Sequence, residues 1–444
     1  MKFILRSLCL LFVVSALSHA QSDVSDFPSL REQARIQQEW LKTRLEKILP
    51  ALMRQNGVQM WIVPMREYNE DPVFSSLVSA TTFAARRRTI YVFFDRDEEK
   101  GVERLALGGS SQGGLYVAYR DTTLGDAELW GKDQWKLLSK VVQERNPKTI
   151  AVNISHTHAF SDGLSAGEWE QLQEALGAEY APKIIRTERL ALDYISVRIP
   201  EMLPHYKRMM EIVHSIIAEA FSNKVISPGK TTTQDVVWWM RQRAHDLGFG
   251  TWFHTSVDVQ RQAADLRNIT DPVIHRGDVL HCDFGISAMR LNTDTQHMGY
   301  VLRDGETDVP EGMKKALTNS NKLQDILMKN MKQGHTGNQI LANTLADMKK
   351  DGIDGTVYTH PIGEHGHGAG PLIGLWDRQM GVPGRGDVPL LASTWHSVEL
   401  QATTPVPEWG GQKVRSAQEE EVEVTKQGEI RWVQKRQTAF HVVR

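Results

Sequence analysis

Two aspartates eleven residues apart, Asp283 and Asp294, constrain this chain more than any other feature. A short apolar run at 279–280 leads into the first aspartate, and a second strand-like run extends over 291–302. Apolar runs of this length, close together in the chain, predict a β-hairpin that carries both carboxylates.

The register of that hairpin decides how close the two carboxylates lie. A turn centred between Ala288 and Met289 would place Asp283 directly opposite Asp294, with Cβ atoms about 5 Å apart. Facing carboxylates repel each other, and a shared divalent cation is the simplest compensation. The alternative is a bulge that shifts the register, because Ala-Met lacks the Asn-Gly chemistry that fixes a two-residue turn.

The start of the chain has the pattern of a secretory signal peptide. Lys2 and Arg6 precede an apolar run at 8–17, and Ser18-His19-Ala20 is a small-x-small cleavage site. We predict cleavage after Ala20, a secreted or periplasmic protein, and no membrane association once the signal is removed. A retained anchor is the alternative, disfavoured because the run is shorter than the ~20 residues that span a bilayer.

The length of 444 residues favours two domains. We predict an N-terminal α/β domain over 21–203, with a long amphipathic helix at 29–52. Its other elements are strands at 60–63, 89–94 and 149–152 and helices at 134–144 and 165–176. The run Arg86-Arg87-Arg88 is expected on a solvated face.

The second domain is predicted over 204–444, after a segment with two prolines at 199–204. Helices are expected at 204–222, 233–247, 311–332 and 337–350, the second one started by a capping box of Thr232 and Asp235. Trp238 and Trp239 are expected in the core. Cys282, the one cysteine left after signal removal, is expected as a buried thiol on the strand face opposite Asp283. The balance of 52 basic and 54 acidic residues gives no reason to expect nucleic acid as a partner.

Three further stretches carry side chains suited to catalysis or metal binding. The segment 359–371 places His360, His365 and His367 among four glycines, whose backbone lets ligands approach closely. Any of the three histidines could ligate a metal or transfer a proton. Glu399 lies within a strand-like run at 397–401, and Glu419 lies at the start of another at 418–425.

Taken together, these residues resemble the superfamily of creatinase, aminopeptidase P, prolidase and methionine aminopeptidase. Its order of metal ligands is an Asp-x-Gly aspartate, an aspartate eleven residues later, a Gly-His-Gly-type histidine and two glutamates on strands. Asp283, Asp294, His367, Glu399 and Glu419 fill that order. The resemblance implies an α+β pita-bread domain, a peptide substrate and a homodimer. It also implies two divalent ions, for which oxygen-rich ligation favours manganese, cobalt, zinc or iron(II), with a bridging hydroxide.

Within that resemblance we expect Glu399 to move the proton, His365 to take part in catalysis, and His360 and His365 to bind substrate. The aminopeptidase P and prolidase branch carries two accessory histidines, seventeen residues before the first aspartate and seven after the ligand histidine. This chain has Leu266-Arg267 and Gly374 there, so His360 or His365 is expected to replace them. Gln296-His297 stands where the family has an arginine.

The sequence therefore predicts an exported dinuclear metallopeptidase of the Xaa-Pro aminopeptidase or dipeptidase type. Two alternatives remain open: a pita-bread protein that binds peptides without catalysis, and a creatinase-like amidinohydrolase.

Overall fold

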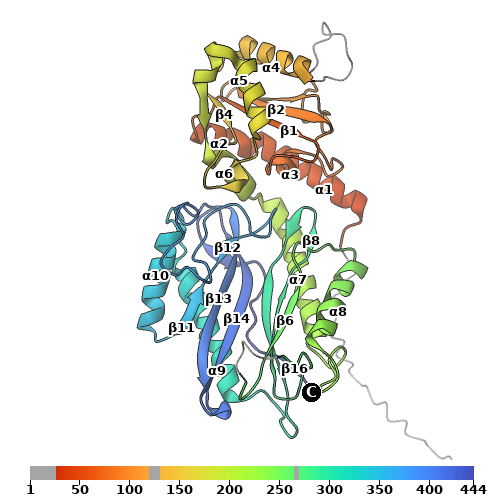
Figure 1. The fold of residues 1–444 in the computed structure, drawn as a ribbon, viewed down its shortest axis with the longest axis vertical. Helices are drawn as coiled ribbons and strands as arrows, with labels where there is room; N and C mark the ends of the chain where they lie inside the picture. The colour runs from red at the N-terminus through yellow and green to blue at the C-terminus, as the bar shows by residue number, and fades with distance from the viewer. Residues whose placement is uncertain (1–26, 120–130, 265–269) are drawn as a thin grey trace, which may run out of the picture.

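The computed structural model describes residues 27–119, 131–264 and 270–444. An N-terminal domain, red to yellow, lies above a C-terminal domain, green to blue (Figure 1). The predicted signal peptide lies outside the described residues. In the part of the chain that the structure covers, no helix is both long and apolar enough to cross a bilayer.

The N-terminal domain opens with the predicted long helix. It consists of α1 (Leu30–Thr43), a π-helical turn (Arg44–Ile48) and α2 (Leu49–Gln55) in direct succession. The hydroxyl of Ser29 caps its start by accepting from the backbone N–H of Glu32. The further helices are α3 (Phe74–Leu77), α4 (Gly131–Arg145), α5 (Ala166–Tyr180) and α6 (Glu188–Ser196).

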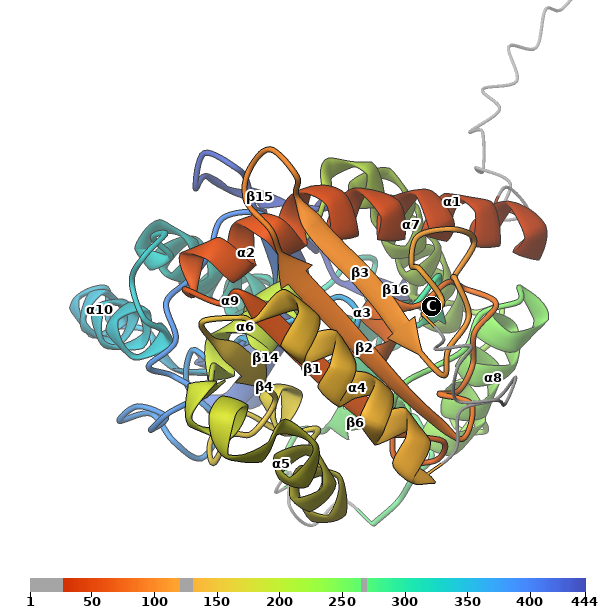
Figure 2. The same ribbon diagram turned by 90° about the horizontal axis from the view of Figure 1, so that it is seen from above.

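Five strands within the described residues form the N-terminal sheet, in the order β3-β2-β1-β4-β5. They are β1 (Met60–Arg66), β2 (Arg88–Asp95), β3 (Val102–Leu107), β4 (Ile150–Val152) and β5 (Ile184–Arg186). Helices α4 and α5 cover the face turned away from the C-terminal domain (Figure 2), and α1, α2 and α6 pack near the other. Because both faces are covered, β1, β2 and β4 are apolar runs.

The C-terminal domain has the four predicted helices, each beginning within one residue of its predicted start. They are α7 (Leu203–Ala220), α8 (Thr233–Asp246), α9 (Glu311–Asn330) and α10 (Gly337–Lys350). The capping box of Thr232 and Asp235 is confirmed. The core placement of Trp238 is wrong: its side chain is 57% exposed, because α8 packs through Val236, Val237 and Met240 on its other side.

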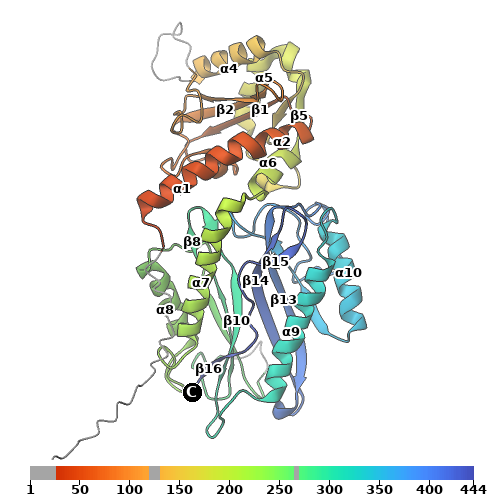
Figure 3. The same cartoon turned by 180° about the vertical axis from the view of Figure 1, so that it is seen from behind.

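A large sheet runs through this domain in the order β11-β13-β14-β10-β7-β6, with β12 on β13, β15 on β14 and β16 on β10. The strands are β6 (Ser256–Gln260), β7 (Val279–Phe284), β10 (Thr295–Val301), β11 (Asp354–Val357), β12 (His360–Pro361), β13 (Thr394–Val406), β14 (Gln412–Val424), β15 (Ile430–Trp432) and β16 (His441–Val443). Helices α7 and α8 pack against the half that contains β7, and α9 and α10 against the half that contains β13 (Figure 3). This two-sided arrangement is the predicted pita-bread architecture.

The hairpin between β7 and β10 exists, but its predicted register is wrong. Its tip is the short pair β8 (Ser287–Ala288) and β9 (Leu291–Asn292), and the turn is made by Met289 and Arg290, both with positive φ (53° and 60°). This turn lies one residue beyond the predicted one. In the resulting register Asp283 pairs with Gln296 instead of Asp294.

The same hairpin tip ties the two domains together. The Arg290 guanidinium donates to the backbone carbonyls of Ser75, Val78, Ser79 and Thr82 at 2.6–3.0 Å. Nearby, the buried Glu364 carboxylate pairs with the guanidinium of Arg44 and accepts from the hydroxyl of Ser76. The glycine-rich segment and the hairpin of the C-terminal domain are thus both anchored on the N-terminal domain.

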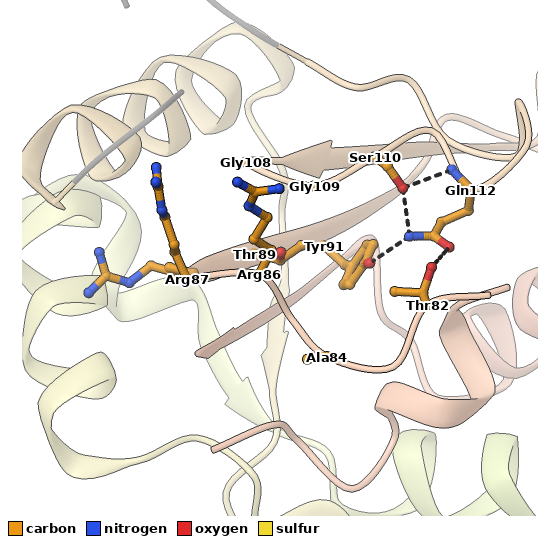
Figure 4. A pocket seen from close by; sticks show the side chains of 11 residues that line it. Thr82, Ala84, Arg86, Arg87, Thr89, Tyr91, Gly108, Gly109, Ser110 and Gln112 are labelled. Atoms are coloured by element: carbon orange, nitrogen blue, oxygen red, sulfur yellow. Dashed lines mark hydrogen bonds between the residues drawn. The ribbon is translucent and has the colours of Figure 1, made fainter. Parts of the chain in front are cut away.

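The arginine run of the N-terminal domain lines a hollow of about 310 Å³. Arg86 and Arg87 share it with Thr89, Tyr91 and the Gly108-Gly109 turn (Figure 4). Arg88 also contributes to the lining. Arg88 is only partly exposed because it pairs with the buried Glu168. No residue of the predicted metal site lines this hollow.

Candidate metal centre

Acidic side chains form one row across the C-terminal sheet. The registers of β13 with β14, β14 with β10 and β10 with β7 pair Glu399 with Glu419, Glu419 with Gln296, and Gln296 with Asp283. Directly paired residues on adjacent strands share a face of the sheet. Four neighbouring strands therefore bring three predicted ligands onto one face, around the amide of Gln296.

Asp294 joins this row from the loop just before β10. Its backbone N–H donates to Glu421 Oε1 at 2.7 Å, and its side chain contacts that of Asp283. Gly285, in the Asp283-Phe-Gly motif, makes room for the returning chain: a Cβ there would lie 2.0 Å from the carbonyl oxygen of Thr293. The glycine of the Asp-x-Gly motif thus lets the two aspartates meet without being cross-strand partners.

The row is electrostatically unfavourable without a cation. Burial, followed by the charge of Glu419, raises the pKa of Asp283 to about 7 and those of Asp294 and Glu399 well above the usual range. The Oδ1 atoms of both aspartates are buried and accept no hydrogen bond. Such unpaired oxygens, beside so many carboxylates, fit the coordination of divalent cations.

His360 is oriented as a metal ligand would be. Its Nδ1 lies 2.9 Å from the carbonyl oxygen of Pro361, and because a carbonyl only accepts, Nδ1 carries the proton. In the neutral ring Nε2 then holds a lone pair, yet it lies 3.1 Å from Glu419 Oε1 and 3.6 Å from Asp294 Oδ2. A lone pair facing carboxylates is repulsive unless a cation lies between them. A metal-binding histidine usually donates its other N–H in this way.

The other two histidines of the glycine-rich segment lie differently. His367 is exposed, and its ring stands edge-on to two others. The distance between ring centroids is 4.7 Å to His360 and 5.2 Å to Trp252. Ligand atoms of His367, Asp294 and His360 lie within 4.8 Å of one another, so these three residues form one group that could hold a metal ion. His365 belongs to none of the groups found among the described residues: it packs on Phe160 of the N-terminal domain at 4.8 Å, and its Nε2 is buried without a partner.

The row also depends on residues that the sequence did not single out as site residues. The Gln296 amide donates to Glu399 Oε1 at 2.6 Å and to Glu419 Oε2 at 2.9 Å, and the Ser397 hydroxyl donates to Glu419 Oε1 at 2.6 Å. Both orient the carboxylates. Ser397 could be found from the sequence by strand alternation, since it lies two residues before Glu399 on the same face.

Comparisons with known proteins agree with this geometry. The family model of metallopeptidase family M24 matches residues 205–426. A search of curated protein sequences found no match. Among solved structures, an X-Pro aminopeptidase from Thermotoga maritima is similar at 20% identity, with a TM-score of 0.61 over 88% of this chain and 100% of that one. An Xaa-Pro dipeptidase from Bacillus anthracis has 17% identity and a TM-score of 0.56 over 93% and 100%.

A prolidase from Pyrococcus furiosus is similar at 14% identity, with a TM-score of 0.53 over 88% of this chain and 100% of that one. The chain belongs to metallopeptidase family M24, since the family model spans half of its length. It is a metallopeptidase with a peptide substrate, dependent on divalent metal.

Proposed function

We propose that the protein is a dinuclear metallopeptidase that releases the terminal residue of short peptides, Xaa-Pro peptides among them. The observation that carries this proposal is the lone pair of His360 Nε2 facing the buried row of carboxylates. The names of the similar structures, an X-Pro aminopeptidase and an Xaa-Pro dipeptidase, support the choice of substrates.

The proposed ligands are Asp283, Asp294, Glu399 and Glu419, with His360 in place of the expected His367. This choice also explains a departure of the sequence from the family pattern. If His360 is the ligand, His367 stands seven residues later, at the offset where the family carries its accessory histidine. The position of the other accessory histidine, Leu266-Arg267, lies outside the described residues.

Divalent ions held there would supply Lewis acidity toward the scissile carbonyl and would activate water. Among the protein's own groups, Glu399 is the proposed proton carrier, because its side chain is 16% exposed whereas that of Glu419 is 1% exposed. The exposed ring of His367 is placed to donate a hydrogen bond to bound peptide. Partial desolvation by the surrounding protein, followed by the charge of His360, lowers the pKa of His367, so its ring is neutral at neutral pH. The predicted role of His365 at the substrate remains a prediction.

A cation near His367 favours substrates with a free carboxylate. Burial lowers the pKa of His367 and that of His158 on the N-terminal domain, and the charge of Arg385 lowers both slightly further, so the guanidinium lies near both rings. Among the described residues no carboxylate pairs with Arg385, and desolvation lowers its own pKa. We propose that Arg385 binds the terminal carboxylate of a dipeptide or tripeptide.

The test is a panel of Xaa-Pro and other dipeptides and tripeptides, assayed after reconstitution with manganese, cobalt or zinc. Chelator-sensitive release of the terminal residue supports the proposal. Absence of turnover, with two metal equivalents bound, would favour the binding-only alternative. Chelator-insensitive hydrolysis of creatine would favour the amidinohydrolase.

Export and dimerisation complete the proposal. We propose that residues 1–20 direct secretion or transfer to the periplasm and are removed, and that the mature chain forms a homodimer. N-terminal sequencing of the protein from its native host should begin at Gln21. Light scattering should give about twice the monomer mass, and a single ~50 kDa species would refute the dimer.

A further inference from the structure

A second cluster of metal-type ligands lies on the sheet face opposite the carboxylate row. Glu419 and Glu420 are neighbours on β14, as Gln296 and His297 are on β10, and successive residues of a strand point to opposite faces. Glu419 and Gln296 therefore face the row, while Glu420 and His297 face α7. The histidine cluster, as we name it, comprises His214, His297, His441 and Glu420.

The contacts within the histidine cluster are short and converge on one carboxylate. Glu420 Oε2 lies 2.9 Å from His214 Nε2, and Glu420 Oε1 lies 2.7 Å from His297 Nε2. The backbone N–H of Gln437 also donates to Glu420 Oε1, at 3.1 Å. On the other side of the His297 ring, Nδ1 of His297 lies 3.0 Å from Nε2 of His441. Ligand atoms of His214, His297 and Glu420 all lie within 4.8 Å of one another.

If the imidazoles of this cluster are neutral, the negative charge of Glu420 has no positive charge beside it within the part of the chain that the structure describes. The side chain of Glu420 is 1% exposed, and among the described residues no lysine or arginine forms an ion pair with it. The nearby Cys282 thiol is buried and adds no positive charge. The hydrogen bond from the Gln437 N–H and the contacts with the two rings stabilise the buried carboxylate, and a protonated histidine or a metal ion would also neutralise its charge.

We propose that His214, His297 and Glu420 bind a divalent transition-metal ion of the zinc type, separate from the ions of the carboxylate row. Two imidazoles and one carboxylate form a ligand set that zinc accepts. His441 would orient the ring of His297 by accepting from its Nδ1–H, the usual second partner of a metal-binding histidine. His214 is 15% exposed, which gives the ion a path from solvent.

The proposed ion would have a structural role. It would join α7, the first long helix of the domain, to the central strands β10 and β14, and through His441 to β16 at the end of the chain. Figure 3 shows α7 lying along the sheet, with β16 near the C-terminus. Binding to the folded state alone would stabilise the domain in proportion to the occupancy of the site.

The experiment uses the full chain with the carboxylate row disabled by Asp283→Asn, Asp294→Asn and His360→Gln, so that each possible ligand group of the row loses at least one member. The two asparagine substitutions remove buried like charges and so should not prevent folding. After demetallation and dialysis against zinc, elemental analysis should find one equivalent per chain in this background. Adding His214→Gln should reduce it to none, whereas His245→Gln, at an exposed histidine, should leave it unchanged.

Two results would overturn the proposal: no bound zinc in the triple variant, or zinc that persists when His214→Gln is added to it. If the His214 variant does not fold, His441→Gln replaces it, since loss of an outer partner should weaken zinc binding about 10- to 100-fold without removing a ligand. Unchanged zinc affinity in that variant would also contradict the proposal. Because the background lacks the row, the result does not depend on the proposed peptidase activity.

Discussion

His360 Nε2 lies 3.1 Å from Glu419 Oε1, on the unprotonated side of the imidazole. This contact distinguishes the three histidines of one glycine-rich segment. His360 is held by β12 against β13, where it pairs with Ser397 beside the row. His367 stands at the exposed rim, and His365 is turned toward the N-terminal domain. One segment thus supplies three different environments.

The first prediction separates His360 from His367. His360→Ala should weaken metal binding by at least tenfold, because it removes a proposed ligand from the row. His367→Ala should keep the metal affinity and lower kcat, since it removes the proposed contact to bound peptide. Calorimetric titration with manganese, together with peptidase assays, measures both effects. Weaker metal binding in His367→Ala alone would restore the assignment expected from the sequence.

The second prediction concerns Arg385. Arg385→Met should raise KM for dipeptides with a free carboxylate by roughly tenfold or more, because a charge-assisted hydrogen bond is lost. The control substrate is the same dipeptide with its C-terminal carboxylate converted to an amide. The KM for this amide should hardly change. An equal rise in KM for both substrates would show that the arginine does not bind the carboxylate.

Much of the fold could be predicted from the sequence because its signals are local. Helix α8 shows its 3.6-residue period and its Thr232–Asp235 capping box, and the buried strand β1 is a plain apolar run. Strand β3 was missed because it is an edge strand that carries Glu103 and Arg104. Trp238 was predicted in the core because it is large and apolar. It lies on the exposed side of α8, and the identity of a residue alone does not tell which side of a helix packs against the domain.

The site was predictable as a set of residues and less so as an arrangement. The register error at the hairpin arose because Met289 and Arg290 adopt positive φ, which residues of these types rarely do. The strain is offset by tertiary contacts, since Arg290 binds carbonyls of the other domain. The position of His360 beside the row, rather than that of His367, follows from the strand β12. That strand is only two residues long, so the sequence shows no alternation of apolar and polar residues that would predict it.

The third prediction tests that domain contact. Arg290→Met should lower the free energy of unfolding by about 3 kcal/mol, because it leaves several backbone carbonyls without a donor. It should also weaken metal binding, since Arg290 lies on the hairpin between Asp283 and Asp294. Urea unfolding with and without metal measures both.

Arg431→Met, at a mostly exposed arginine paired with Glu429, serves as the control and should change the stability by less than about 1 kcal/mol. Arg290→Lys should resemble Arg290→Met, because one ammonium group cannot reach carbonyls that a guanidinium fork spans. A lysine variant as stable as the wild type would show that the charge alone suffices.

The last prediction concerns acid sensitivity and His396, a fully buried residue of β13. Both ring nitrogens lack hydrogen-bond partners, and burial, followed by the charges of His360 and Arg198, lowers its pKa to about 3. A histidine whose pKa is lower in the folded state binds its proton more tightly in the unfolded state, so the free energy of unfolding falls as the pH is lowered. Its contribution is fully present above the unfolded pKa near 6.5 and is lost progressively as the pH falls toward 3.

At pH 5 the pKa shift corresponds to a loss of about 2 kcal/mol relative to pH 7.5. His396→Leu cannot be protonated and fills a similar volume, so its stability relative to the wild type should rise by that amount between pH 7.5 and pH 5. Chemical unfolding of both proteins at the two pH values measures the difference, in which the titration of all other groups cancels. His245→Leu, at an exposed position, should show no such change. An equal loss of stability in His396→Leu and the wild type would mean that protonation of His396 does not limit the acid stability of the fold.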